Sequence, residues 1–564
     1  MKELIIKILK NALKEKGIKL KEEEIENLLE TPPSPDMGDY AFPCFSVAEK
    51  LKQEPHEMAL EIREKIGTSP VDFESIQTAG PYINFFMDRK NLARNLIREI
   101  LSEKENFGKT NLGNRKKIVV EFSSPNIAKP FGVSHLRSTI IGNSIANICE
   151  FVGFKPVRMN YLGDWGTQFG KLILGYNKFG NQNKLEKDPI KHLFDVYVRV
   201  NKSKKYEDEA REWFKELEDG NKDVVRLWET FRDLSLKEFE KIYKILGINF
   251  DVCDRESMYN KKIGRIAEML KEKKLLRKSE GALIVSLKKY KLGVCLIEKS
   301  DGTTLYATRD IASAIDRYRR YKFKKMIYEV GQEQELYFKQ VFKILELMGY
   351  DWAKNCVHIY HGLYLNKDGK RFATRKGKTV FLEDIISETV SLAKKEIQKR
   401  VPKISEKELE ERALKIAIAA IFYGDLKNNR TNNIVFDIER FISFEGDTGP
   451  YIQYSYARAG SILRKAKQKD KKQSNINELE TKEVGLIKKL SQFREIVLNS
   501  YKNLNPSVIA NYSYQLAQIF NEFYHACPVI GSEQESFRLE LVEAFRQVLK
   551  NSLSLLGIET LEEM

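Results

Sequence analysis

Apolar and polar residues follow two different periods along the chain, and the change of period divides it into three parts. The first hundred or so residues carry amphipathic helical patterns around a strand-like run at 82–86, and a segment rich in proline and glycine, 31–43, interrupts them. This mixture predicts a small α+β domain over residues 1–108. A polar stretch with glycines follows, so we expect the domain boundary between 108 and 114.

The middle of the chain shows the order strand, helix, strand. A β-branched run at 118–120 leads into a proline-bounded turn, a helical pattern at 135–152 and a second strand-like run at 157–161. This order predicts a Rossmann-like α/β domain with a parallel sheet over residues 112–382. We expect a charged, mostly helical insertion at about 171–277. After it, three segments are predicted to return to strands of the same domain: LIVSL, GTTLYATRD and KMIYEVG.

From residue 383 onward, almost every segment keeps its apolar residues at a helical period of 3.6. The pattern predicts an α-helical bundle over residues 383–564. The predicted fold class is therefore α/β at the centre, with an α+β domain before it and a helical bundle after it.

Charge and cysteine usage narrow the functional class. The chain of 564 residues carries 96 Lys and Arg against 80 Asp and Glu, a formal net charge of +16. This excess favours polyanionic partners, with nucleic acid first and anionic membrane surfaces second. The six cysteines lie far apart and form no C-x-x-C pair, as expected for thiols in a reducing compartment. No apolar run approaches the roughly 18 residues of a membrane-spanning helix, so we expect a cytoplasmic protein that does not cross a membrane.

Several common catalytic motifs are absent from the sequence: G-x-G-x-x-G, the phosphate-binding loop, H-E-x-x-H and G-x-S-x-G. What remains is the strand, turn and helix that lead to His135. Backbone N–H groups at a helix N-terminus favour anions, and Lys129, His135 and Arg137 add charge or hydrogen bonds. From the residues alone, this segment is a candidate phosphate site, with ordinary packing as the alternative.

Five segments resemble, in the same order, the sequence blocks of the class I arginyl-tRNA synthetases. The resemblance implies an arginine–tRNA ligase, which activates L-arginine with ATP to arginyl-adenylate and pyrophosphate and transfers arginine to the 3′-terminal adenosine of tRNA(Arg). It also implies that tRNA is needed for activation and that the protein is a monomer. We expect Mg²⁺ with ATP, because it neutralises phosphate oxygens, and name no metal ligands, since this ion usually binds through substrate phosphates and water. The segments are EFSSPNIAKP, NYLGDWGTQFGKLI, LYATRDIASA, TRKGKTVFLEDI and EGDTGPYIQYSYARAGSILRK.

The same blocks imply an arginine pocket built from two sets of residues. One set follows the first strand and holds the α-amino end of the substrate, and the other surrounds the guanidinium. A carboxylate such as that of Asp310 binds a planar guanidinium through two parallel charge-assisted hydrogen bonds, which the point charge of lysine cannot reproduce. The alternative for Asp310 is an ion pair within its own helix. The first set is Glu121, Ser124 and Asn126, and the second is Tyr306, Asp310 and Gln334.

Both ATP blocks depart from the pattern of the family. The first, usually H-x-G-H, reads G-V-S-H here, and the second, usually K-M-S-K, reads R-F-A-T-R-K. Because cation placement carries this chemistry, we expect Lys129 to offset the lost lysine of the second block. The resemblance assigns ATP binding to Lys129, Gly132, Ser134 and His135, and catalysis to Lys129, His135, Arg371, Arg375 and Lys376.

We expect tRNA contacts in both terminal domains, because unpaired bases stack on aromatic side chains while basic residues follow the backbone. Each aromatic residue could equally belong to the core. The candidates are Asp39, Tyr40, Phe42 and Asn84 near the N-terminus, and Tyr451, Tyr454, Arg458 and Arg464 in the helical region.

Two other interpretations stay open at this point. The altered ATP blocks would also suit a catalytically impaired, synthetase-like protein that only binds tRNA, although such a protein has no use for an arginine pocket. Another class I synthetase, such as the cysteinyl or glutamyl enzyme, is disfavoured because zinc-type cysteine spacing is absent.

Overall fold

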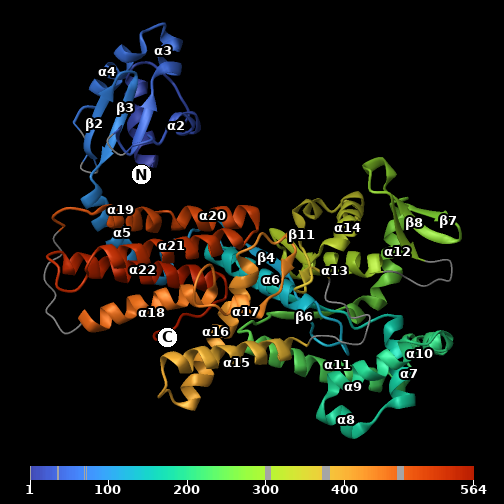
Figure 1. The fold of residues 1–564 in the computed structure, drawn as a ribbon. Helices are drawn as coiled ribbons and strands as arrows, with labels where there is room; N and C mark the ends of the chain where they lie inside the picture. The colour runs from blue at the N-terminus through green and yellow to red at the C-terminus, as the bar shows by residue number, and fades with distance from the viewer. Residues whose placement is uncertain are drawn as a thin grey trace. The chain divides into compact units, whose positions relative to one another are not determined.

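The computed structural model describes residues 2–34, 37–68, 70, 73–298, 306–370, 381–466 and 476–564. Contacts divide the chain into two compact units (Figure 1). The first contains residues 1–104, 466–491 and 522–544, and the second contains residues 105–465, 492–521 and 545–564.

The N-terminal part of the first unit is an α+β fold, as predicted. Its antiparallel sheet has the order β1-β3-β2, and β2 and β3 are joined by a tight turn in which Gly80 has a φ of 56°. Apolar side chains such as Ile5 and Phe85 fill the core between the sheet and the helices. The strands are β1 (Tyr40–Pro43), β2 (Phe73–Ala79) and β3 (Tyr82–Met87), and the helices are α1 (Lys2–Glu15), α2 (Glu22–Leu28), α3 (Phe45–Leu51), α4 (Pro55–Ile66) and α5 (Arg89–Glu103).

The second unit is built around a five-stranded parallel sheet of order β11-β10-β4-β5-β6. The predicted parallel sheet is therefore confirmed. Residues 118–120 of the central strand β4 are all apolar, as is typical of a strand that is buried on both faces. The strands are β4 (Lys117–Glu121), β5 (Lys155–Leu162), β6 (Val252–Arg255), β10 (Lys325–Gly331) and β11 (Cys356–His361).

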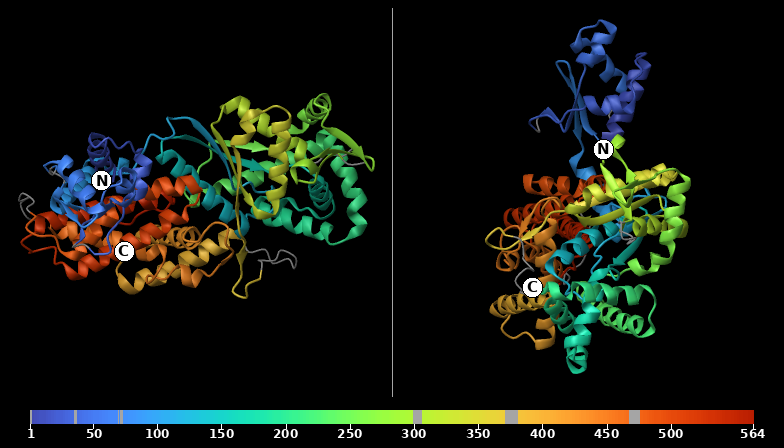
Figure 2. Two further views of the ribbon diagram at one scale, coloured as in Figure 1. Left: turned by 90° about the horizontal axis from the view of Figure 1, so that it is seen from above. Right: turned by 90° about the vertical axis from the view of Figure 1, so that its right-hand side faces the viewer.

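Helices cover both faces of this sheet, as the views in Figure 2 show. Helix α6 (Val133–Phe151) contacts β4, β5 and β10. It lies so close to the segment after β4 that a Cβ at Gly142 would come within 2.2 Å of the Phe122 side chain, so only glycine fits there. On the other face, Val119 of β4 shares a core with residues of α13 (Tyr306–Tyr321) and α14 (Glu335–Leu347).

Helices dominate the region of the predicted insertion, but one strand inside it belongs to the main sheet. Strand β6 pairs with β5 in parallel, and the short 3₁₀ helix η4 (Glu256–Lys262) follows it directly. The helices are α7 (Thr167–Phe179), α8 (Gln182–Lys187), α9 (Pro189–Asn201), α10 (Glu207–Glu218), α11 (Lys222–Ile245) and α12 (Ile263–Glu272).

Of the three later strand predictions, LIVSL and KMIYEVG are confirmed as strands and GTTLYATRD was wrong, while LIVSL belongs to a different sheet from the one expected. LIVSL lies in a separate antiparallel sheet of β7 (Leu276–Ser279), β8 (Ala282–Ser286) and β9 (Val294–Glu298), because the left-handed Glu280–Gly281 turn pairs neighbouring strands locally. In GTTLYATRD, the part from Tyr306 onward begins helix α13, whose apolar residues continue at helical spacing, and residues 301–305 lie outside the described part of the chain. KMIYEVG is strand β10, as predicted.

The C-terminal region is almost entirely helical, as predicted. Residues of α16 near its C-terminal end are buried all round rather than on one stripe. No helix among the described residues is long and apolar enough to span a bilayer. The helices are α15 (Leu382–Arg400), α16 (Glu406–Leu426), α17 (Ile438–Phe441), α18 (Gly449–Ala466), α19 (Thr481–Ser491), α20 (Phe493–Asn503), α21 (Ser507–Ala526) and α22 (Glu535–Leu555), and β12 (Tyr364–Leu365) pairs with β13 (Ile434–Val435).

Candidate active site

The carboxyl ends of the parallel strands gather most of the described arginine-pocket candidates at one edge of the sheet. Glu121 is the last residue of β4, and Gln334 lies just beyond β10 with an exposed side chain. Ligands of open α/β sheets bind at this edge, where loops from neighbouring strands diverge. Asp310 lies on α13, in the second turn of that helix.

The turn after β4 has an unusual backbone that its neighbours hold in place. Ser123, Ser124 and Ala128 have φ values of 72°, 45° and 58°, which are costly for residues other than glycine. The Ser123 amide donates to Ser138 Oγ of α6 at 3.0 Å, and the Ala128 amide donates to Ser235 Oγ of α11 at 2.9 Å. The buried hydroxyl of Ser124 has no hydrogen-bond partner among the described residues, which leaves it available to a ligand.

Asn126 is held beside β5. Its backbone bridges Gly163, and its side-chain Oδ1 would lie 2.2 Å from a Cβ at that glycine. Gln168 of α7 connects the two predicted sites, since its Nε2 donates to Asn126 Oδ1 at 3.5 Å and its Oε1 accepts from Lys129 Nζ at 3.4 Å. Burial lowers the pKa of Lys129, so this cation lies in a partly desolvated position.

Glu121 forms a buried ion pair that the sequence did not predict. Its carboxylate accepts a hydrogen bond from Arg317 Nη1, and the two side chains are 4% and 1% exposed. Arg317 also lies 3.7 Å from Asp254 and over the ring of Tyr161. Burial raises the pKa of Glu121 to about 7, against the attraction of Arg317. One carboxylate oxygen of Glu121 is therefore already engaged within the protein.

Asp310 is oriented by a residue from the next helix. The Tyr337 hydroxyl of α14 donates a hydrogen bond to Asp310 Oδ2. Burial raises the pKa of Asp310, and the hydrogen bond from Tyr337 opposes that rise. The side chain of Tyr306, the third guanidinium candidate, lies outside the described residues.

A second carboxyl group, that of Glu256 in η4, interacts electrostatically with Asp310. Burial raises the pKa of Glu256 to about 8, and repulsion from Asp310 adds to the rise. Its buried Oε2 has no hydrogen-bond partner within the described chain. Sequence reasoning missed Glu256 because β6 lay unrecognised within the predicted insertion, and it missed Tyr337 although this residue follows Gln334 by one helical turn. Two repelling buried carboxyls are suited to a cationic ligand.

The first ATP block forms the start of α6. Gly132 precedes the helix, and its amide donates to His135 Nδ1 at 3.2 Å. Burial, with Lys129 and His361 nearby, lowers the pKa of His135 to about 4. The ring is therefore neutral near pH 7, and because Nδ1 accepts a hydrogen bond, its proton lies on Nε2.

The second ATP block lies outside the described residues, and so do the catalytic candidates within it, Arg371, Arg375 and Lys376. The described part of the chain resumes at Phe381, which forms an antiparallel bridge with Gly132 of the first block. The Leu382 amide donates to the Phe131 carbonyl at 3.1 Å. The segment that begins at Phe381, after the second block, is thus anchored at the start of α6. The side chain of Ser134 is also outside the described residues.

Arg137 does not take part in this anion site. Its guanidinium is 1% exposed and lies 3.5 Å from the Asp425 carboxylate of α16. The prediction that Arg137 adds a phosphate contact is therefore wrong, because the helix turns its side chain into the core.

The N-terminal tRNA candidates differ in accessibility. Asp39 accepts from the Met87 amide at 3.0 Å and from Arg89 Nη2 at 3.1 Å, and Tyr40 is half-buried at the start of β1. Phe42 is fully buried and Asn84 is 8% exposed. A direct tRNA contact by Phe42 is contradicted by its burial, because β1 turns this ring into the core.

Among the C-terminal candidates, Tyr451, Tyr454 and Arg458 lie half-buried at helical spacing on α18. The guanidinium of Arg458 lies 4.8 Å from the centre of the Tyr454 ring. Arg464, one to two turns further on, donates to the Glu562 carbonyl at 3.2 Å and is exposed.

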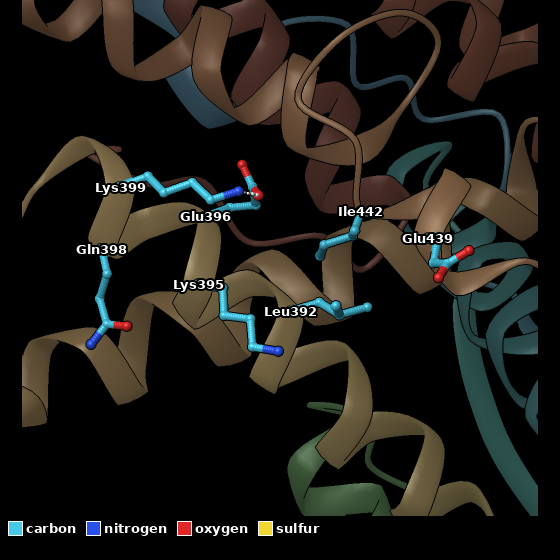
Figure 3. A pocket seen from close by; sticks show the side chains of 7 residues that line it. All are labelled: Leu392, Lys395, Glu396, Gln398, Lys399, Glu439 and Ile442. Atoms are coloured by element: carbon cyan, nitrogen blue, oxygen red, sulfur yellow. Dashed lines mark hydrogen bonds and ion pairs between the residues drawn. The ribbon is translucent and has the colours of Figure 1, made fainter.

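A surface pocket between α15 and the segment around α17 contains none of the predicted site residues (Figure 3). The Lys399 ammonium pairs with Glu396 at 2.6 Å on its wall, which is typical of a solvated ion pair. Its lining residues are Leu392, Lys395, Glu396, Gln398, Lys399, Glu439 and Ile442.

Comparison with known protein families accounts for nearly the whole chain. Residues 3–87 match the family described as "Arginyl tRNA synthetase N terminal domain". Residues 96–438 match "tRNA synthetases class I (R), catalytic domain", and residues 452–564 match "DALR anticodon binding domain".

Full-length relatives agree with these matches. The chain is 46% identical to the arginine–tRNA ligase of Clostridium perfringens over 556 residues, which cover 97% of this chain and 98% of the relative. It is also 46% identical to that of Clostridium acetobutylicum, over 96% of this chain and 97% of the relative.

Solved structures share the fold. The arginyl-tRNA synthetase of Plasmodium falciparum aligns over 100% of this chain and 99% of its own with a TM-score of 0.79 at 26% identity. That of Thermus thermophilus aligns over 100% of both chains with a TM-score of 0.77 at 24% identity.

Proposed function

Because the chain belongs to the class I arginyl-tRNA synthetases and is an arginine–tRNA ligase, we propose that it binds arginine at the carboxyl edge of the parallel sheet, between β4, η4 and α13. The observation that carries this proposal is the pair of repelling buried carboxyls, Asp310 and Glu256. A bound guanidinium compensates both charges and lowers the pKa of both groups. Arg309 and Arg317 already offset part of this repulsion, and an apolar or anionic side chain would add no compensation to theirs.

The two ends of arginine meet different groups in this site. Asp310 takes the guanidinium, assisted by Glu256, Tyr306 and Gln334. The α-amino end lies near the turn after β4, where Asn126 and the unpartnered Ser124 hydroxyl face it. Glu121 contributes charge there, while its pairing with Arg317 fixes its position.

ATP occupies the start of α6 in this proposal. The N-terminal amides of the helix attract phosphate, and the neutral His135 donates from Nε2. Gly132 and Ser134 line the turn, and Lys129 brings a cation to it. The arginine carboxylate attacks the α-phosphorus and pyrophosphate leaves, while Lys129, Arg371, Arg375 and Lys376 stabilise the charge that develops on the phosphate oxygens.

Magnesium enters with ATP in this proposal. Within the described residues, no group of three or more His, Cys, Asp or Glu side chains is placed to hold a metal ion. Because Mg²⁺ usually binds through substrate phosphates and water, we name no protein ligands for it. When bound, the ion neutralises charge on the phosphates.

The tRNA partner is tRNA(Arg), and we propose that its binding is required for activation. Tyr451, Tyr454, Arg458 and Arg464 contact the anticodon region, and Asp39 and Tyr40 contact the body of the tRNA. The domain limits that go with this proposal are 1–108, 112–382 and 383–564, and the protein acts as a cytoplasmic monomer.

Pyrophosphate exchange with each amino acid in turn, with and without tRNA(Arg), tests this proposal. Exchange with arginine alone and only in the presence of tRNA is the expected result. Exchange that survives Asp310→Asn unchanged would overturn the pocket, and silence with every amino acid in a protein that still binds tRNA would support the catalytically impaired alternative.

A further inference from the structure

We propose that Tyr337 is the positioning residue that fixes the carboxylate plane of Asp310 for the arginine guanidinium. This inference rests on the proposed role of Asp310 in the arginine pocket. Tyr337 lies in the first turn of α14, and its hydroxyl donates to Asp310 Oδ2 across the gap between α14 and α13.

Tyr337 is well placed for this role because its ring is anchored independently of the pocket. The ring packs against the core that the sheet shares with α13 and α14. It meets the Phe338 ring edge-on, with centroids 5.5 Å apart and an interplanar angle of 72°. The change Tyr337→Phe removes only the hydroxyl oxygen and keeps the ring that packs in this core.

The geometry matters more for arginine than for a point charge. A guanidinium presents parallel N–H groups in one plane, and both bonds form only when the carboxylate lies in that plane. The carboxylate torsion of an aspartate is broad when nothing holds it. The Tyr337 hydrogen bond holds Oδ2, and the Tyr161 hydroxyl also stabilises the ionised carboxylate. In this proposal the substrate binds the lone pairs of the two oxygens that Tyr337 does not use.

The hydroxyl also affects the charge of Asp310. Burial favours the protonated acid, and donation from Tyr337 favours the carboxylate. Removal of the hydroxyl therefore raises the fraction of protonated Asp310 most at low pH. The charged and titratable groups that face Asp310 come from several elements: Tyr337 of α14, Tyr161 of β5, Tyr328 of β10, Arg309 and Arg317 of α13, Glu256 of η4 and Glu121 of β4.

The test is pyrophosphate exchange in the presence of tRNA(Arg), with Tyr337→Phe, Asp310→Asn and wild type compared at pH 6.5 and 8.5. For Tyr337→Phe we expect the KM for arginine to rise about tenfold, as for loss of one hydrogen bond to a charged group, with kcat and the KM for ATP within about twofold. The KM for arginine of Tyr337→Phe, divided by that of wild type, should be larger at pH 6.5 than at pH 8.5.

Tyr318→Phe is the matched control, since it removes a hydroxyl from the same core, on the helix that carries Asp310. It should leave all three constants unchanged. An unchanged KM for arginine at both pH values in Tyr337→Phe, with Asp310→Asn inactive, would overturn the role of Tyr337 alone. A parallel loss of kcat, ATP affinity and thermal stability would also overturn it, because it would indicate a structural role. Full activity of Asp310→Asn would overturn the arginine pocket itself.

Discussion

The guanidinium of Arg137 in α6 lies 3.5 Å from the carboxylate of Asp425 in α16, and both side chains are 1% exposed. The Tyr364 hydroxyl donates to the same carboxylate, and Arg137 Nη2 donates to the Arg430 carbonyl at 3.1 Å. Helix α6 carries the first ATP block at its N-terminus, so this buried pair ties that helix to the C-terminal helical region. Its removal should therefore affect stability before it affects substrate binding.

Replacing Asp425 by Ala leaves the buried Arg137 cation uncompensated. We expect a loss of about 3–5 kcal/mol in the free energy of unfolding, measured by urea denaturation. The control is Glu439→Ala, which removes an exposed partner of Lys367 and should cost less than about 1 kcal/mol. Equal losses in the two variants would contradict a specific role for the buried pair.

The parallel sheet could be predicted from the sequence because its central strands are buried on both faces. Residues 118–120 and 326–328 are short apolar runs, and the β-branched residues in them favour strands. The turn after β4 was located by its prolines and by its place between strand and helix. Its held conformation was not predictable, since Ser235 and Tyr243 act on it from α11, more than a hundred residues away.

The parts that were not predicted depend on contacts between distant segments. Glu256 lies near the other site residues because the four-residue strand β6, which precedes it, pairs with β5. So short a strand is hard to detect within a helical region. The burial of Phe42 follows from the pairing of β1 with β3. Arg137 looked like a phosphate ligand because Asp425 lies 288 positions further along the chain.

A side chain at Gly163 should weaken arginine binding. A Cβ at this position would come within 2.2 Å of Asn126 Oδ1, so Gly163→Ala must displace the Asn126 side chain. We expect the KM for arginine to rise about tenfold or more, measured by pyrophosphate exchange with tRNA present. Gly264→Ala in α12 is the control, since nothing lies within 4 Å of its added methyl group. A KM for Gly163→Ala equal to that of this control would contradict the placement of Asn126.

Arginine binding should weaken at low pH. The pKa of Glu121 is raised to about 7 and that of Glu256 to about 8, so both carboxyls gain protons as the pH falls through this range. The guanidinium is attracted by ionised Glu256 and the α-amino group by ionised Glu121, and we therefore expect the KM for arginine to fall as the pH rises from 6 to 8.5. The KM for ATP, measured in the same series, should not follow this trend. A KM for arginine that does not change with pH would mean that neither carboxyl group interacts with the substrate.

The charge of Glu256 should lower the stability of the free protein and strengthen its binding of arginine. Its pKa is raised in the folded state, so the stability that its protonated form contributes is lost as the pH rises through about 8. Because glutamine does not ionise, Glu256→Gln does not lose this stability as the pH rises. We expect its melting temperature to exceed that of wild type at pH 8.5, with a smaller difference at pH 5.5, while the KM for arginine rises. A melting temperature below wild type at pH 8.5 would show that Glu256 is compensated within the free protein.

Lys129 should contribute to the ATP chemistry of arginine activation. Its ammonium lies 3.4 Å from Gln168 Oε1, just before the altered first ATP block, and burial lowers its pKa. If it offsets the lysine missing from the second block, Lys129→Ala should reduce the rate of arginine activation at least about tenfold, or roughly 1.4 kcal/mol in the barrier. Lys171→Ala, which removes a lysine from the same helix as Gln168, is the control. Activation of Lys129→Ala at the wild-type rate would shift the cationic role to Arg371, Arg375 and Lys376.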